Sequence, residues 1–312
     1  MVKLAKTERV RAATTPLLAL PRSATVEARA GDDLAGGTRS RFLAAWLHAA
    51  SRLGSFQGET ASAGALRSIG FIRPRRRSAD PLASSSRRTM RLQYLSFDAW
   101  LEHAFGREVR FQQAPWYFDP EHDWWDPPAL EAVSYLTRLF EDPEPALQGF
   151  SDSQIAQGLT YLVNTNAAGD RRWLCSTDVP VEGRVRCVRS VAALFAKLFE
   201  PRCEPRLSHL SQAASKALNG VCYMWWDAFP SLALADDPDL PTLHDCALQT
   251  MDRILQLESI ACQESALHGL GHWHRDYSNK VSHIIDRFCE VHSGIDPRLS
   301  AYAQSARCGC VL

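Results

Sequence analysis

Apolar side chains recur every three or four residues from Ser96 onward, which is the spacing of one face of an α-helix. The first such segment, 96–106, begins with a serine that suits an N-cap and ends with a glycine that suits the position after a helix. A second apolar stripe begins after Pro128, and a third follows Ser151 and Gln154, which form a capping box. The first half of this region therefore predicts three amphipathic helices.

The second half of the chain repeats the same spacing, and prolines interrupt it at several points. Asp296-Pro297 has the pattern of an N-cap followed by proline at the first helical position. Short strands are expected only near 90–95 and 107–112. The further helices are predicted at about 185–198, 207–229, 241–255, 259–273, 277–292 and 297–308. Helices joined by short linkers pack as antiparallel neighbours, so we expect a mostly all-α fold.

The C-terminal third resembles HEAT-like helical repeats. The resemblance is carried by the segments 265–273, 284–288 and 296–309, which combine small residues with an Asp-Pro helix start. No clean second copy of the pattern occurs upstream. The resemblance implies a scaffold or protein-binding surface and no particular catalysis. The predicted fold is therefore an irregular multi-helix bundle or a short HEAT-like α-helical stack.

Charge divides the chain at Met90. Residues 1–89 hold 16 Lys and Arg against 6 Asp and Glu, whereas residues 90–312 hold 19 against 29. The first part is rich in Arg, Ser and Ala and has little apolar surface to bury, so we expect a disordered extension, with Met90 as a candidate native start. A targeting segment and a nucleic-acid-binding arm at 73–88 are the alternatives. The acidic part, 90–312, is predicted to be one helical domain that does not bind nucleic acid.

All nine cysteines follow Met90, and several occupy apolar positions of predicted helices. Buried thiols of this kind fit a reducing compartment better than a disulfide framework, so we expect a cytoplasmic protein. The sequence contains no secretory signal and no apolar run that is long enough to span a membrane. We therefore expect no membrane partner.

Glu264, His268 and His272 form the sharpest candidate for metal chemistry, because they follow one another at four-residue steps on one predicted helix face. Carboxylate and imidazole groups can hold a divalent ion. The alternative is an exposed pair of Glu264 and His268, with His272 at the helix end. No cofactor is expected if that alternative holds.

Two other groups suggest weaker sites. Cys308 and Cys310 are one residue apart and could bind a metal ion with further ligands, or they could be ordinary thiols in a frayed tail. Four aspartates near a predicted helix junction do not match the spacing of a calcium loop, and we expect a solvated acidic linker. These residues are Asp227, Asp236, Asp237 and Asp239.

An aromatic and acidic segment gives the leading functional hypothesis. Aromatic rings concentrate at recognition sites, and the acidic groups could meet a basic partner. The alternative is a loop whose rings attach it to the core. Nucleophile and phosphate-binding motifs are absent from the sequence. We therefore expect a non-catalytic scaffold or immunity-type protein that binds another protein, with a metal-dependent enzyme as the alternative. The predicted partner-binding residues are Trp116, Tyr117, Phe118, Asp119, Glu121, Asp123, Trp124 and Trp125.

Overall fold

The computed structural model describes residues 91–92, 94–109, 114–119, 122–163, 173–210, 216–229, 237–292 and 294–311. The chain divides into two units, Met1–Ala45 and Trp46–Leu312, and every described residue belongs to the second. The predicted extension 1–89, with its basic run at 73–88, lies outside the described residues. All described residues thus belong to the predicted helical domain, 90–312.

The described part of the chain is all-α apart from one pair of two-residue strands. Strands β1 (Arg91–Leu92) and β2 (Trp124–Trp125) pair in parallel. The helices of the first half are α2 (Phe97–Phe105), α3 (Ala129–Glu141), α4 (Pro143–Leu147), α5 (Asp152–Val163), α6 (Val181–Leu194) and α7 (Glu200–Arg202). The helices of the second half are α8 (Ala217–Tyr223), α9 (Trp225–Ala228), α10 (Leu240–Ile254), α11 (Ile260–Val291) and α12 (Pro297–Arg307). The predicted fold class is confirmed.

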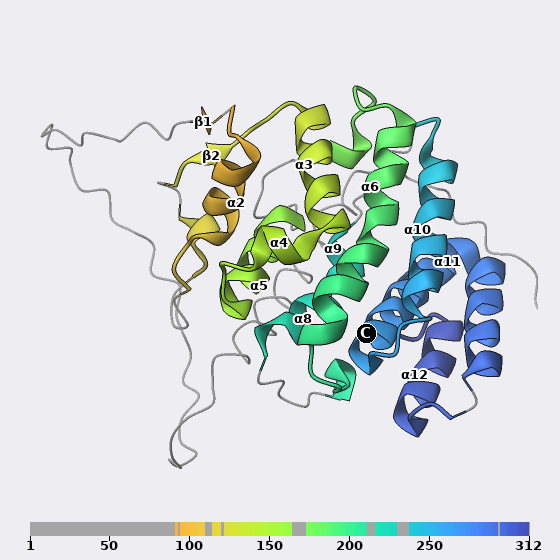
Figure 1. Ribbon diagram of the computed structural model, residues 1–312. Helices are drawn as coiled ribbons and strands as arrows, with labels where there is room; N and C mark the ends of the chain where they lie inside the picture. Colours follow the sequence, from red (N-terminus) through yellow and green to blue (C-terminus); the bar gives the residue numbers. More distant parts are fainter. Residues whose placement is uncertain are drawn as a thin grey trace, which may run out of the picture. The chain divides into compact units, whose positions relative to one another are not determined.

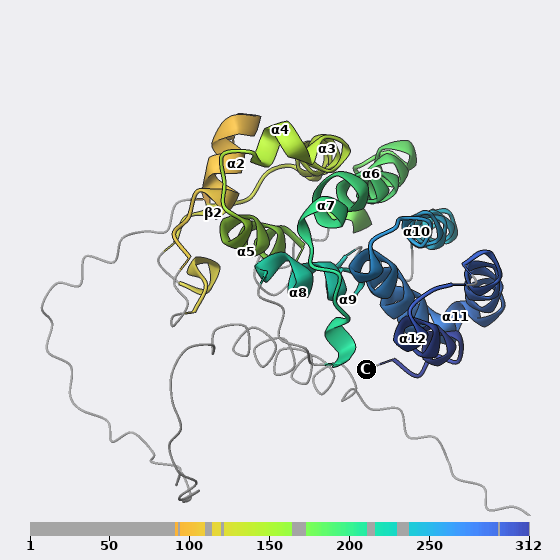
Figure 2. The same ribbon diagram turned by 60° about the horizontal axis from the view of Figure 1, so that its bottom comes forward.

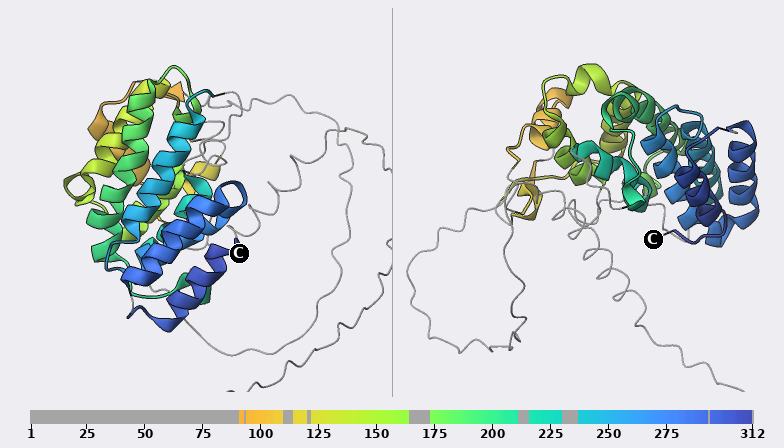
Figure 3. Two further views of the ribbon diagram at one scale, coloured as in Figure 1. Left: turned by 90° about the vertical axis from the view of Figure 1, so that its right-hand side faces the viewer. Right: turned by 90° about the horizontal axis from the view of Figure 1, so that it is seen from below.

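Two rows of helices share one core. Helices α3, α6, α10, α11 and α12 each contact the next, and the views from two sides show them lying side by side (Figures 1 and 3). Helices α2, α5 and α8 form the second row, and α8 and α9 both contact α11 (Figure 2). Trp100, Trp125 and Trp225 are fully buried within this arrangement. The amphipathic stripes predicted from the sequence are thus buried against one another.

Several helices begin at the capping residues predicted from the sequence. The Ser96 hydroxyl accepts a hydrogen bond from the Ala99 amide, and Ser151 and Gln154 exchange the two bonds of a capping box. Asp296 accepts a hydrogen bond from the Arg298 amide at the start of α12. Each of these side chains satisfies a backbone N–H group that the first turn of a helix leaves without a partner.

One predicted helix was wrong, and one predicted division between helices was confirmed. The single helix expected at 207–229 is divided into a 3₁₀ turn at Ser208–Leu210 and the short helices α8 and α9, with non-helical backbone at Met224. This break lets Trp225 and Trp226 both enter the core. The two helices expected at 259–273 and 277–292 are present within α11, because non-helical backbone at Tyr277 (φ −133°, ψ 37°) divides it into two helical segments. Among the described residues, no helix has the length and apolar character needed to cross a membrane.

A glycine brings α11 close to α9. A Cβ atom added at Gly269 would lie 2.6 Å from Cβ of Trp226 and 2.8 Å from the sulfur of Met251. Only glycine permits this approach without moving its neighbours. The contact matters for function because Asp227 follows Trp226 on α9, while His268 and His272 lie on either side of Gly269 on α11.

Candidate functional site

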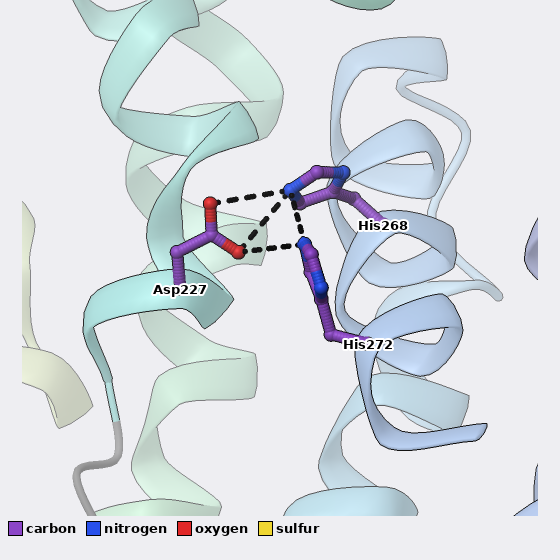
Figure 4. A group of neighbouring side chains, drawn as sticks. All are labelled: Asp227, His268 and His272. Carbon is purple, nitrogen blue, oxygen red and sulfur yellow. Dashed lines mark hydrogen bonds and ion pairs between the residues drawn. The ribbon is translucent and has the colours of Figure 1, made fainter. Parts of the chain in front are cut away.

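Three side chains from two helices meet at the contact between α9 and α11. Asp227 comes from α9, and His268 and His272 are one turn apart on α11 (Figure 4). Each offers one potential ligand atom, and these three atoms all lie within 4.8 Å of one another. The described residues contain no other group of three His, Cys, Asp or Glu side chains that meets this criterion.

The separations between the three groups are short. Nε2 of His268 lies 3.2 Å from Oδ1 of Asp227, and Nε2 of His272 lies 3.1 Å from the same oxygen. The two Nε2 atoms are 3.1 Å apart. A metal ion with metal–nitrogen bonds of about 2.0–2.1 Å holds neighbouring ligands about 2.9 Å apart at a right angle and about 3.4 Å apart at a tetrahedral angle. The observed separations fall within this interval.

Hydrogen bonding alone does not account for this triangle of contacts. Each of its three sides needs one proton between its two atoms, but each Nε2 atom carries at most one proton and an ionised carboxylate carries none. At least one side therefore brings together two acceptors or two N–H groups. A cation that accepts a lone pair from each of the three groups removes this conflict.

The cluster is partly enclosed. The His268 side chain is 1 % exposed and the Asp227 side chain 10 %, whereas the His272 side chain is 34 % exposed. Burial raises the pKa of Asp227, but hydrogen bonds and favourable charge interactions with His268 and His272 outweigh it and hold this pKa at about 2. The carboxylate is therefore ionised at neutral pH, as a metal ligand must be.

Two tyrosines complete the surroundings of His268. The Tyr302 hydroxyl, from α12, lies 2.8 Å from Nδ1 of His268 and 3.2 Å from the Tyr223 hydroxyl. The Tyr223 ring packs on the His268 ring with centroids 4.4 Å apart. Burial raises the pKa of both tyrosines, that of Tyr223 to about 12, so both keep their protons at neutral pH. Metal-binding histidines usually have such a partner on the second ring nitrogen, because it fixes the tautomer.

Glu264 does not join His268 and His272. Its side chain is fully buried, and its carboxylate accepts hydrogen bonds from the backbone amides of Ser208 and His209, at 2.7 and 2.9 Å. The His209 ring contacts the same carboxylate at 2.6 Å. The expected exposed pair of Glu264 and His268 is therefore wrong. Glu264 instead fixes the Ser208–Leu210 turn against α11.

His272 lies near the end of the first helical segment of α11, which stops at the kink at Tyr277. This position agrees with the predicted alternative, but the His272 ring also contacts Asp227 and His268. Two of the three predicted metal-site residues, His268 and His272, are thus brought together, and Asp227 takes the position expected for Glu264.

The four aspartates expected in a solvated linker have different surroundings. Asp227 lies in the cluster, and the buried Asp237 pairs with Arg184, whose side chain is 1 % exposed. Asp239 contacts the same guanidinium group from a more exposed position. Asp236 lies outside the described residues. The expectation of a solvated linker is therefore wrong for Asp227 and Asp237.

The aromatic segment faces mainly inward. Tyr117 is 2 % exposed and Trp125 is fully buried, and Trp116 packs on Tyr161 with centroids 4.6 Å apart. The prediction that Tyr117 and Trp125 offer their rings to a partner is wrong, because both contribute to the core. Phe118, Asp119 and Asp123 are exposed. Glu121 and the side chain of Trp124 lie outside the described residues.

Comparisons with protein-family models, with curated proteins and with solved structures gave no match. The interpretation of the cluster therefore depends on its geometry. Sequence spacing found His268 and His272 but missed Asp227, which precedes His268 by 41 residues. Its position directly after the buried Trp225 and Trp226 was the available signal.

Proposed function

We propose that this protein is a metal-dependent enzyme that binds one divalent ion through Asp227, His268 and His272. The observation that carries the proposal is the convergence of these three ligand atoms, because no distribution of protons satisfies all of their contacts. Nitrogen and carboxylate ligands suit Zn²⁺ and Fe²⁺.

The number of protein ligands favours a catalytic ion. Structural zinc sites have four protein ligands, whereas catalytic sites have three and keep a position for water or substrate. Solvent can reach the cluster beside His272, whose side chain is 34 % exposed. An ion held there would lower the pKa of a bound water molecule and supply a hydroxide nucleophile near neutral pH. We therefore assign the reaction class as metal-assisted hydrolysis.

The residues around the cluster have supporting roles in this proposal. Tyr302 accepts the Nδ1 proton of His268, which leaves the Nε2 lone pair for the ion. Glu264 and Gly269 hold α11 against its neighbours. The scaffold or immunity-type function and the HEAT-like resemblance stay predictions. The buried aromatic rings remove much of the surface on which the partner-binding hypothesis depended.

Metal analysis of the full chain tests the proposal. After removal of metal with a chelator, the protein is titrated with Zn²⁺ and with Fe²⁺ under anaerobic conditions, and the bound metal is counted. We expect one tightly bound ion per chain in the unaltered protein, and its loss in the His268→Ala and Asp227→Asn variants. His283→Ala is the matched control, because His283 is an exposed histidine of the same helix. Hydrolysis of an activated ester by the metal-loaded protein, absent from His268→Ala, tests the reaction class. Binding below one equivalent, or equal binding by His268→Ala, contradicts the metal site.

A further inference from the structure

The C-terminal turn holds two thiols close together on the surface. Cys308 and Cys310 are both exposed, and their sulfur atoms lie 3.0 Å apart. The other seven cysteines are less accessible: six are buried and Cys289 is half-buried. These two thiols are therefore the pair that a reagent in solution can reach most readily.

The backbone fixes this pair. Gly309 has a positive φ of 70°, its amide donates to the carbonyl of Ala306, and the amide of Cys310 donates to the carbonyl of Ser305. These two bonds define a Schellman motif, a common ending of an α-helix. Cys308 and Cys310 flank its glycine, so the turn that ends α12 also sets the separation of the two thiols.

Side chains anchor the turn to α11. Val311 fills the space above Gly271, where an added Cβ atom would lie 2.6 Å from Cγ2 of Val311. A Cβ atom added at Gly309 would likewise lie 3.0 Å from Nδ1 of His274. The frayed tail expected from the sequence is therefore wrong for residues 308–311. The two thiols are held near each other before any reaction occurs.

Among the described residues, the lack of further ligands favours disulfide chemistry over metal binding at Cys308 and Cys310. Two thiolates bound to one zinc ion with bonds of about 2.3 Å lie about 3.8 Å apart at a tetrahedral angle, and the other ligands must come from elsewhere. The observed 3.0 Å lies between this separation and the disulfide bond length of about 2.05 Å. No third Cys, His, Asp or Glu side chain of the described residues completes a metal group here.

We propose that Cys308 and Cys310 form a thiol–disulfide exchange site whose substrates are low-molecular-weight disulfides such as oxidised glutathione. One of the two thiols loses its proton and attacks a sulfur of the substrate, which gives a mixed disulfide and releases one thiolate. The other thiol, also deprotonated, attacks the protein sulfur of the mixed disulfide, forms the Cys308–Cys310 bond and releases the second thiolate. The two protons end on the released thiols. The dithiol is oxidised and the substrate disulfide is reduced to two thiols.

Trypsin makes the test direct, because cleavage after Arg307 releases residues 308–312 with both thiols in one short peptide. The reduced, chelator-treated full chain is incubated with oxidised glutathione, and free thiols are then blocked in acid. After digestion with trypsin, the mass of the peptide 308–312 is measured by mass spectrometry. We expect a peptide that has lost two hydrogen atoms and carries no glutathionyl group. Cys308→Ser and Cys310→Ser should each keep one glutathionyl group, because the second step is absent. Cys289→Ser is the control and should behave as the unaltered protein.

A further variant tests whether the turn geometry matters. Gly309→Ala places a side chain at a positive φ and against His274, so it should disturb the turn without removing a thiol. We expect its mixed disulfide to persist at least about tenfold longer than that of the unaltered protein, which corresponds to a modest loss of prearrangement. A glutathionyl group that persists on the unaltered protein, with no internal disulfide, overturns the proposal. So does a pair of thiols that does not react at all.

Discussion

The Tyr302 hydroxyl lies 2.8 Å from Nδ1 of His268, so α12 fixes the orientation of a histidine on α11. Tyr302 was not among the residues predicted for either the partner-binding site or the metal site, yet it contacts a histidine of the candidate metal site. The same hydroxyl is 3.2 Å from that of Tyr223, which packs on the His268 ring. Both residues of this pair are buried, since Tyr302 is 7 % exposed and His268 is fully buried.

Replacing Tyr302 with phenylalanine should weaken metal binding. The change keeps the ring but removes the acceptor for the Nδ1 proton of His268. Loss of such a partner typically lowers metal affinity about 10- to 100-fold, and we expect a decrease of about that size here. Competition with a chromophoric chelator measures the dissociation constant. Tyr223→Phe is the matched control and should have a smaller effect, because Tyr223 contacts His268 through its ring. Equal affinities for Tyr302→Phe and the unaltered protein would show that the hydroxyl does not orient a metal ligand.

Alanine at Gly269 should move Asp227 on α9 away from the two histidines on α11. The new Cβ atom overlaps Trp226 and Met251, and forcing extra atoms into a packed contact costs about 1–3 kcal/mol. Because Trp226 adjoins Asp227, relief of this overlap moves Asp227 away from the two histidines, so metal affinity should also fall. Urea unfolding and the chelator competition measure the two effects.

Gly183→Ala is the matched control for that substitution. Gly183 lies in helix α6, and a Cβ atom there would meet only Cγ1 of Val179, at an ordinary 3.5 Å. Alanine is favoured over glycine within a helix by about 0.5–1 kcal/mol, so this variant should be slightly more stable and bind metal normally. A Gly269→Ala protein that is as stable as Gly183→Ala would contradict the close packing of α9 against α11.

The helices could be predicted because their signals are local. The Ser96 cap, the Ser151–Gln154 box and the Asp296-Pro297 start each act within three residues, and the apolar stripes between them repeat at a helical period. The break at Met224 had no such signal, since it accompanies the burial of two adjacent tryptophans, Trp225 and Trp226, in the core. Whether the helix breaks at Met224 therefore depends on the packing of the whole core.

The site could be predicted only in part, for a related reason. A step of four residues identifies neighbours on one helix, and it correctly brought His268 and His272 together. It also assigned Glu264, whose carboxylate instead satisfies the Ser208 and His209 amides. Asp227 comes from another helix, and its approach depends on the packing of Gly269 against Trp226. Nothing in the spacing of a single sequence reveals such a contact.

Arg184 makes a buried ion pair with Asp237, and its loss should be costly. The two side chains are 1 % and 2 % exposed, so removing one leaves an uncompensated charge in the core. Breaking a pair of this kind typically costs about 3–5 kcal/mol. Arg184→Met should therefore lower the free energy of unfolding by about that amount in a urea titration. Arg186→Met is the control, because the pair of Arg186 with Glu141 is exposed and should contribute little.

A double substitution separates the ion pair from simple packing. Arg184→Met combined with Asp237→Asn removes both charges, so the unfavourable buried carboxylate is no longer present. We expect the double variant to be more stable than Arg184→Met alone, with a coupling energy above about 1 kcal/mol. Additive effects of the two substitutions would mean that Arg184 and Asp237 do not compensate each other.

Asp296 should make stability depend on pH in a defined acid range. Its pKa is lowered from 3.8 to about 2, first by the side-chain hydrogen bond from Arg298 and then by backbone N–H groups at the start of α12. A carboxyl group whose folded pKa lies below its unfolded value binds protons more readily in the unfolded chain, so it stabilises the fold above about pH 4. That contribution is lost as the pH falls towards 2. Asp296→Asn keeps an N-cap but does not titrate. The midpoint of thermal unfolding should therefore be higher for the unaltered protein than for Asp296→Asn at pH 5, and most of this difference should be lost by pH 2. A difference that stays constant over this range would show that the cap does not act through the ionised carboxylate.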